Sequence, residues 1–187
     1  MKYDVIVADP PWPYESKRMV LQNGQHTEGV SDRYDVMTMD DMLELDVKSV
    51  AAKKSICFMW VTGPKLKEGI ELLESWGFKY RTIAFVWNKQ VPMPGYYTMS
   101  QTEMVLVGKR GAAPKRVKFN TRQIVDVVRM KHSQKPEEVQ DRIEETYPNT
   151  NKLELFARRK RAGWTCLGNE IDGLDIRQAM QEIGSEQ

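Results

Sequence analysis

Short apolar runs recur along the chain, separated by amphipathic or polar stretches. The run from Val5 to Ala8 is continuous, as expected of a buried strand, whereas large side chains alternate at Ile83, Phe85 and Trp87. The pattern predicts strands at residues 3–8, 55–61, 79–87, 102–107, 123–128, 153–156 and 164–167. Because helical stretches separate most of these strands, it predicts an α/β fold with a mainly parallel sheet flanked by helices.

Helix boundaries are indicated by capping residues. Thr38 is a suitable N-cap with two aspartates in the turn after it, so residues 38–45 are expected to form a short helix. Pro64 begins a second helix and Gly77 ends it. Further helices are expected at residues 136–147 and in the tail from Asp172.

Two polar segments interrupt the pattern, at residues 13–37 and 88–100, and are expected to be loops. A loop as long as the first, inside a compact domain, is often functional. The connector 109–122 gathers the basic residues Lys109, Arg110, Lys115, Arg116, Lys118 and Arg122. Such a run is commonly a solvated face, but it can also contact phosphates.

Composition limits the kind of protein this is. The chain has 187 residues, 41% of them hydrophobic, and a net charge of +2 at pH 7. Its length fits one domain over residues 1–187. No apolar run approaches the roughly 20 residues that span a membrane, and the N-terminus lacks the layout of a signal peptide. Only two cysteines, Cys57 and Cys166, and two histidines occur, which favours the reducing cytoplasm and provides no zinc pattern, so no metal is expected.

The most specific chemistry lies in Asp9-Pro10-Pro11-Trp12, directly after the first predicted strand. Prolines have no N–H to donate, and the backbone carbonyls here are expected to stay free to accept hydrogen bonds. Such a site suits a planar ring that stacks on Trp12 while its exocyclic amine donates to Asp9 and to a carbonyl near Pro10. Two acceptors around an aromatic amine favour its nucleophilic form. The plainer interpretation is a strand end followed by a rigid turn.

A second motif, His132 to Pro136, precedes a predicted helix. Pro136 suits the first helical position, and Ser133 or Gln134 can cap the helix. Lys135 does not fit this pattern, because a cation at a helix N-terminus opposes the helix dipole. It indicates a negatively charged ligand, such as a carboxylate, held by Lys135 and the free N–H groups of the helix.

Two further short strands end in polar residues. Phe156 and Arg158 come after one of them, and Gly168, Asn169 and Glu170 come after the other. A polar or acidic side chain at a strand end commonly holds ribose hydroxyls, a place that Asn169 or Glu170 would fill. The chain has no Gly-x-Gly-x-x-Gly run, so a dinucleotide site is not indicated.

These motifs resemble those of a known family. Asp9 to Trp12 resembles the catalytic motif of amino-group methyltransferases that use S-adenosylmethionine, in which a leading Asp usually goes with adenine as substrate. Residues 133–136 look like the Thr-Gln-Lys-Pro motif of β-class DNA amino-methyltransferases. The runs 152–158 and 164–170 resemble the branch that contains the catalytic subunit of the messenger-RNA adenosine methyltransferase and its bacterial and phage relatives. Residues 60–63 and 106–108 also match this branch.

The resemblance implies a Rossmann-like methyltransferase domain and a role for each motif. Asp9, Pro10, Pro11 and Trp12 would be catalytic, with Asp9 between the target amine and the amino group of the cofactor. S-adenosylmethionine would be the cofactor, with Lys135 on its methionine carboxylate, Ser133 nearby, Phe156 and Arg158 flanking it, and Asn169 and Glu170 on its ribose. The segment that would contact its adenine is not identified, because the chain begins almost at the catalytic strand.

The implied substrate is adenine in nucleic acid, with DNA favoured over RNA. In a duplex the base must first be flipped out. The loop 13–37, with Tyr14 and Tyr34, would close over the base, and the connector, with Lys115 and Arg116, would track the strand. Relatives act as monomers, homodimers or heterodimers, so either kind of dimer is open.

Three other interpretations remain open. A catalytically inactive binding subunit usually loses the Asp-Pro-Pro-Trp motif or the cofactor lysine, and this chain keeps both. A cytosine amino-methyltransferase is expected to have Ser in place of Asp9. A protein-glutamine methyltransferase is expected to have Asn there. The first residue of the motif therefore separates the enzymatic alternatives.

Overall fold

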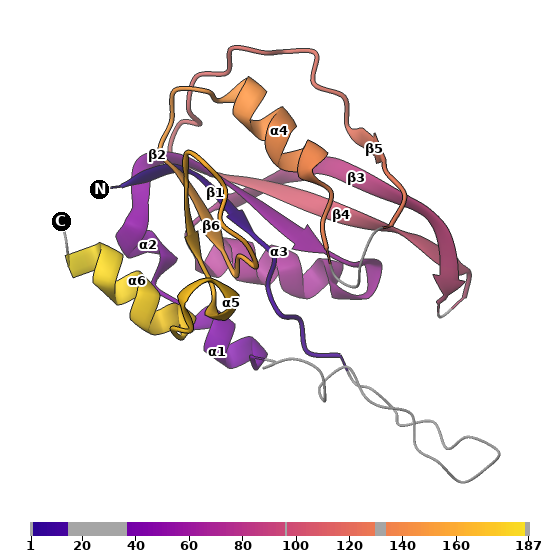
Figure 1. The fold of residues 1–187 in the computed structure, drawn as a ribbon, viewed down its shortest axis with the longest axis horizontal. Coiled ribbons are helices and arrows are strands. Elements are labelled where there is room, and N and C mark those ends of the chain that lie inside the picture. The colour runs from indigo at the N-terminus through magenta and orange to yellow at the C-terminus, as the bar shows by residue number, and fades with distance from the viewer. Residues whose placement is uncertain (1, 15–36, 96, 130–133, 186–187) are drawn as a thin grey trace, which may run out of the picture.

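A twisted sheet forms the centre of the computed structural model, which describes residues 2–14, 37–95, 97–129 and 134–185 (Figure 1). In this part of the chain the sheet has seven strands in the order β5-β3-β4-β2-β1-β6-β7. The strands are β1 (Tyr3–Ala8), β2 (Ala51–Val61), β3 (Lys79–Pro94), β4 (Met99–Arg110), β5 (Ile124–Asp126), β6 (Lys152–Leu155) and β7 (Trp164–Leu167). The helices are α1 (Met39–Leu43), α2 (Val47–Val50), α3 (Leu66–Ser75), α4 (Glu137–Thr146), α5 (Asn169–Asp172) and α6 (Ile176–Ser185), with a 3-10 turn η2 (Gly63–Lys65) before α3.

The pairing of the strands is mainly parallel. Strand β1 runs parallel to both β2 and β6, and the pairs β6–β7 and β3–β5 are parallel as well. Only β4 runs antiparallel to its neighbours β2 and β3 in the described sheet. The predicted α/β fold, a Rossmann-like arrangement with helices on a mainly parallel sheet, is confirmed.

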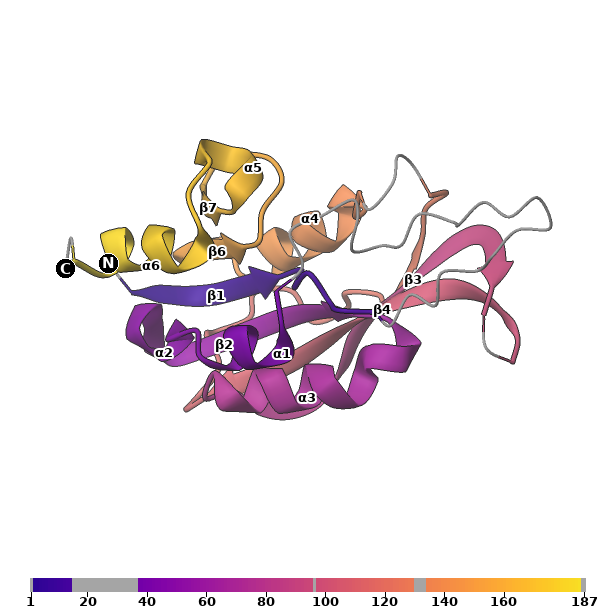
Figure 2. The same cartoon turned by 90° about the horizontal axis from the view of Figure 1, so that it is seen from below.

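The sheet is covered on both faces, which explains the continuous apolar run of β1. Ile6 and Ala8 face one core cluster, shared with α1, α2, α3 and α6, while Val5 and Val7 face the other, shared with α4. Figure 2 shows α3 and α4 on opposite sides of the sheet. A strand buried on both faces has no polar alternation, because neither side meets water.

Several local predictions are confirmed by the backbone. Thr38 caps α1 through a capping box with Asp41, as the sequence indicated. Gly77 lies two residues beyond α3 and has φ 85°, the left-handed conformation that commonly follows the end of a helix. The tail predicted to be helical from Asp172 forms α6, preceded by the short helix α5. Helix α2, before β2, was not predicted.

The prediction of a loop at residues 88–100 is wrong for most of that range, because β3 and β4 extend into it and form a hairpin (Figures 1 and 2). The prolines of β3 are tolerated here because β5 pairs with β3 only as far as Asn88, which leaves one edge of the hairpin free. A bulge separates Asn88 from Met93, where Gln90 has φ 59° and donates its N–H to the Asn88 side chain at 3.1 Å. The connector is correspondingly shorter, since Lys109 and Arg110 belong to β4.

Two predicted positions around helix ends also need correction. Pro136 is the N-cap residue of α4 rather than its first helical residue, and no side chain caps this helix. Asn169 and Glu170 lie in α5 rather than at the end of a strand. Gly168 allows this arrangement, because a Cβ there would lie 2.2 Å from the Ala157 carbonyl oxygen. The chain therefore passes from β7 to α5 in close contact with the loop after β6.

Candidate active site

A cavity of about 360 Å³ opens where β1, β2 and β6 end and α4 begins. Ligands of open α/β sheets bind at such carboxyl ends of strands. The residues that line it come from the end of β1 (Asp9), from β2 (Trp60), from the start of α4 (Gln134 to Pro136 and Gln140) and from β6 and the segments after it (Glu154, Phe156, Arg158, Arg159 and Glu170). Most of the predicted cofactor residues described by the structure therefore meet in one place.

Asp9 stands at the rim of β1 and is mostly buried, with 19% of its side chain exposed. Its N–H bonds to the Leu155 carbonyl at 3.4 Å, and its Oδ2 lies 2.9 Å from Lys135 Nζ. Burial raises the pKa of Asp9 above its usual value, although Lys135 opposes the shift. The carboxylate is thus held in a fixed position as an acceptor that burial makes a stronger base.

The prolines of the motif do not leave every carbonyl free, which corrects the expectation drawn from the sequence. The Pro10 carbonyl accepts the Trp12 N–H at 2.8 Å. One lone pair of that oxygen remains for a second hydrogen bond.

Trp12 is part of the core rather than an open platform. Its side chain is only 6% exposed, and its indole Nε1 donates to the Trp60 carbonyl at 3.0 Å. Trp12 is not among the residues that line the cavity, whereas Trp60 is. In this conformation Trp12 fixes the turn after Asp9, and stacking on a base would require one of its ring faces to become exposed.

Lys135 connects Asp9 to residues that the sequence motifs did not include. Its Nζ lies 3.4 Å from Glu103 Oε2 and 5.5 Å from the centre of the Trp60 ring. Glu103 in turn pairs with Lys89 at 3.3 Å. Burial lowers the pKa of Lys135, but the Asp9 and Glu103 carboxylates outweigh it and leave that pKa above its usual value. We call Asp9, Lys135, Glu103 and Lys89 the charged chain.

Glu103 was missed because it looks like any other polar residue of a strand. It lies in β4, where a surface glutamate is unremarkable in sequence. Only the long-range pairing of β4 with β2 brings it near the start of α4. No local signal could have found it.

Gln140 and Glu154 form a second polar pair in the cavity, from α4 and β6. Burial raises the pKa of Glu154, and a hydrogen bond donated by the Gln140 side chain opposes this shift. Gln140 is 7% exposed, and apart from this contact with Glu154 its Nε2 has no hydrogen-bond partner among the described residues. The two side chains are therefore polar partners of each other at the wall of the cavity.

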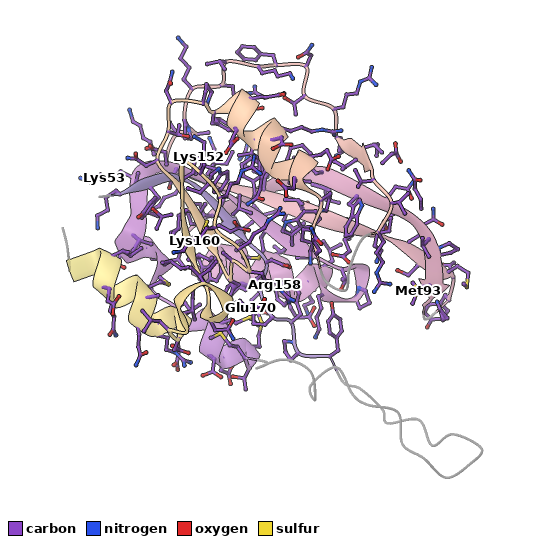
Figure 3. All side chains as sticks on the ribbon, viewed as in Figure 1. Lys53, Met93, Lys152, Arg158, Lys160 and Glu170 are labelled. Carbon is purple, nitrogen blue, oxygen red and sulfur yellow. The ribbon has the colours of Figure 1, made fainter. Side chains whose placement is uncertain are left out.

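Arg158 and Glu170 close the cavity from the loop after β6 and from α5. Figure 3 shows the two side chains next to each other, and Arg158 NH1 lies 3.7 Å from Glu170 Oε1. Phe156, between β6 and Arg158, has φ 62° although it is not glycine. Backbone strain of this kind often accompanies functional sites. Asn169 begins α5, is exposed and does not line the cavity.

The predicted substrate residues fall in different places. Tyr14 is half-buried near Asp9, with its hydroxyl 2.7 Å from Thr62 Oγ1, and burial raises its pKa. Lys115 and Arg116 are exposed, and the connector that carries them packs on the last turn of α4, where the Val117 N–H bonds to the Thr146 carbonyl. The cavity is at the opposite end of that helix, so the structure does not bring them to Asp9. Tyr34 and Ser133 lie outside the described residues.

Comparison with known proteins settles which family has this arrangement. The family model MT-A70 matches residues 3–170. The chain belongs to the MT-A70 family. The family predicted from the motifs is thereby confirmed.

Among MT-A70 relatives, the chain is 43% identical over 182 residues to the Type II methyltransferase M.MunI of Mycoplasma sp, a match covering 91% of this chain and 78% of that protein. It is 34% identical over 184 residues to a putative N(6)-adenosine-methyltransferase MT-A70-like protein of Medicago truncatula. It is 30% identical over 188 residues to the human N(6)-adenosine-methyltransferase catalytic subunit METTL3. The chain spans 27% of the Medicago protein and 29% of the human one.

The cavity of this MT-A70 chain fits the methyl donor of the family. Methyltransferases of this family use S-adenosylmethionine, which carries a positive sulfonium and an α-amino acid group. The cavity volume is in the range of small-molecule sites. Two mostly buried carboxylates, Asp9 and Glu154, suit the positive groups of this donor. Within the described part of the chain, no helix combines the length and apolarity needed to cross a membrane.

Proposed function

We propose that this chain transfers the methyl group of S-adenosylmethionine to the exocyclic N6 amine of adenine in DNA, acting as one methyltransferase domain over residues 1–187. The observation that carries the proposal is the mostly buried Asp9 carboxylate at the rim of a cofactor-sized cavity, held by Lys135. Membership of the MT-A70 family supports the reaction type. The similarity to M.MunI, a Type II methyltransferase, favours DNA over RNA.

The catalytic residues act mainly by placing the reactants. The N6 amine donates one hydrogen bond to Asp9 and the other to the Pro10 carbonyl, whose second lone pair remains for it. These two acceptors would fix the direction of the nitrogen lone pair, so that this chain contributes mainly by orienting the amine. The methylated amine would then lose its extra proton to Asp9 or to water. Pro11 and Trp12 keep the turn rigid.

The cofactor residues supply the remaining contacts. Phe156 and Arg158 are assigned to the sides of the donor, and Asn169 and Glu170 to its ribose. Gly168 lets the start of α5 pack against Ala157. Lys135 and Ser133 are assigned to the methionine group. Because Lys135 is already placed between two carboxylates, its first role here is to keep Asp9 ionised and in position. S-adenosylmethionine supplies an activated methyl group when bound.

The substrate is proposed to lie on the other side of Asp9, near Tyr14. In a duplex the target adenine would be flipped out of the stack to reach Asp9. Tyr34 is proposed to contact the base, and Lys115 and Arg116 are proposed to contact phosphates farther along the strand.

Methyl transfer to a matched set of substrates tests the proposal. The set contains single- and double-stranded DNA and RNA of the same sequence, incubated with labelled S-adenosylmethionine and digested to nucleosides for mass analysis. We expect N6-methyladenine, mostly from DNA. Preference for RNA would replace DNA as the substrate and keep the chemistry. No transfer to any of the four by a protein that binds the cofactor would contradict an enzyme that works alone.

A further inference from the structure

The β3–β4 hairpin projects past the edge of the sheet that carries the active site, and the proposed catalytic roles do not use its far end. Val61 is the last residue of β2 and pairs with Met104 of β4, which also pairs with Val86 of β3. Beyond that level β4 continues for the five residues Met99–Glu103. At about 3.4 Å per residue, the hairpin reaches roughly 17 Å past the end of β2. Both views of the ribbon show this projection (Figures 1 and 2).

The base of the hairpin is fixed relative to Asp9. Because β4 is antiparallel to both β2 and β3, β3 points toward the same edge of the sheet as β2 and β1. Lys89 and Glu103, at the base of the hairpin, belong to the charged chain that reaches Asp9 through Lys135. Only β2 separates β4 from β1, a lateral distance of about 10 Å. The hairpin therefore stands beside the place proposed for the target base.

The far end of the hairpin is apolar, uncharged and exposed. The sequence from residue 90 to residue 102 contains no Asp, Glu, Lys, Arg or His. Four large side chains there expose from 41% to 100% of their surface, namely Val91, Met93, Tyr97 and Met99. We call these four side chains the hairpin end, and Figure 3 shows Met93 where the hairpin lies farthest from the rest of the sheet. Exposed apolar side chains gathered in one place mark an interaction surface.

The backbone of the hairpin argues against a strand of another protein as the partner. Proline in a strand lies where its missing N–H faces away from the neighbouring strand. Pro92 and Pro94 therefore deprive the free edge of β3 of two donors that an added strand would need. The same prolines stiffen the strand that carries the hairpin end. Methionine and proline are among the side chains that proteins insert between base steps of DNA, and tyrosine stacks on bases.

We propose that the hairpin end inserts into duplex DNA beside the target adenine and packs against the bases that the flipped adenine leaves unstacked. Flipping costs the pairing and stacking energy of the base, and contacts of Met93, Tyr97 and Met99 with the exposed neighbours offset part of that cost. The reach of roughly 17 Å exceeds the depth of a DNA groove, about 7.5–8.5 Å, so the hairpin end can arrive at the base stack. This role rests on the proposed function, because it names how duplex DNA yields its adenine to the same site.

Substrates that differ only in the cost of flipping test this role. An adenine that the wild type methylates would be placed opposite thymine, opposite a mismatched cytosine, or in a single strand. Single-turnover methyl transfer would be measured for the wild type, for Tyr97→Ser and for Met93→Ser combined with Met99→Ser. We expect each variant to slow methylation of the matched duplex roughly tenfold, the scale of one lost stacking contact, and that of the single strand by less than about twofold. The mismatched duplex should lie between them, since its adenine is easier to flip.

Two further variants serve as matched controls. Tyr97→Phe keeps the ring and should keep the wild-type rate on every substrate. Ile124→Ser removes an apolar side chain that is 49% exposed from β5, where Ile124 pairs with Val86 at the level at which β2 ends, and should also change no rate. Thermal unfolding shows that each variant is folded, and light scattering reports its oligomeric state.

Each result decides the proposal. Unchanged rates of both hairpin variants on the matched duplex would overturn it, and so would equal losses on duplex and single strand, because the hairpin would then act on the active site itself. Dissociation of a wild-type dimer by the same substitutions would assign the hairpin end to a second copy of the chain and overturn it as well. A wild type that methylates single strands but no duplex would also contradict the insertion, whereas one that methylates no adenine would overturn the proposed function. A loss concentrated on the matched duplex supports the proposal.

Discussion

The charged chain and the Gln140–Glu154 pair lie in and around one cavity but differ in how their polar groups are satisfied. In the charged chain, Lys89, Glu103, Lys135 and Asp9 alternate in sign and pair at 3.3, 3.4 and 2.9 Å. In the Gln140–Glu154 pair, the amide donates to the carboxylate, and Glu154 makes no ion pair among the described residues. The first group is held together by ion pairs within the protein, whereas the second is joined by a single hydrogen bond.

This difference separates two tasks of a methyltransferase. The acceptor that meets the target amine must be in place before the reaction, since positioning contributes only if it requires no rearrangement. The groups that bind a cofactor must instead keep some hydrogen-bonding capacity, because the ligand supplies further partners. Substitutions in the charged chain should therefore change the rate and its pH dependence, and substitutions in the Gln140–Glu154 pair should change cofactor affinity.

The largest effect is expected for Asp9→Ala. Loss of the carboxylate should lower the rate of methyl transfer by about 1000-fold. The fold should survive, because Lys135 keeps Glu103 as a partner. Single-turnover kinetics would measure the rate, and thermal unfolding would show that the variant is intact. Substantial activity in a well-folded Asp9→Ala protein would refute the catalytic role.

Trp12 tests whether the motif next to Asp9 is built for rigidity or for stacking. Trp12→Ala should lower the free energy of unfolding by about 3–5 kcal/mol, because it empties a buried site. Trp12→Phe should cost only about 1 kcal/mol, for the hydrogen bond to the Trp60 carbonyl. Denaturant titration would measure both. Full stability of Trp12→Ala with a raised KM for nucleic acid would instead favour an exposed stacking face.

Glu103 and Lys135 should shift the pH profile in opposite directions. Transfer needs the Asp9 carboxylate, so the rate falls as pH drops through the pKa of Asp9. Glu103 raises that pKa and Lys135 lowers it. Glu103→Gln should therefore move the acid limb of a kcat-against-pH profile to lower pH, and Lys135→Met should move it to higher pH.

The control for this pair is Glu145→Gln. This substitution removes an exposed glutamate of α4 that forms an ion pair with Lys118. It should leave the pH profile of kcat unchanged. If Glu103→Gln moved the acid limb to higher pH, the proposed coupling to Asp9 would be wrong.

The smallest effect is expected in the connector. Lys115→Ala with Arg116→Ala should change kcat/KM for a short oligonucleotide by no more than about twofold, the scale of a surface substitution of about 0.5 kcal/mol. The reason is that the connector packs on the end of α4 away from the cavity. A large loss with the short substrate would contradict this placement, while a loss confined to long DNA would indicate phosphate contacts far from the target base.

The extent to which the fold was predictable depends on how local its signals are. The continuous apolar run of β1 and the capping residue of α1 depend only on neighbours in sequence, and both were predicted. The extended β3–β4 hairpin was not, because Pro92 and Pro94 look like loop residues unless the free edge of β3 is known.

The site divides in the same way. Asp9 stands out because it begins the Asp-Pro-Pro-Trp motif, and Lys135 because a cation at a helix N-terminus breaks a local rule. Glu103, Gln140 and Glu154 fit the ordinary pattern of a strand or a helix and gain their meaning from neighbours far along the chain. Even for Lys135, the sequence indicated a negative partner but could not show that Asp9 and Glu103 are its partners within the protein.

The most direct test of the account traces the methyl group itself. The wild type and Asp9→Ala would be incubated with S-adenosylmethionine carrying a deuterated methyl group and with adenine-containing DNA, and the nucleosides would be identified by mass spectrometry. The account predicts deuterated methyl on adenine N6 with the wild type and labelling slowed about 1000-fold with Asp9→Ala. Methyl on cytosine, or equal labelling of adenine by both proteins, would contradict it.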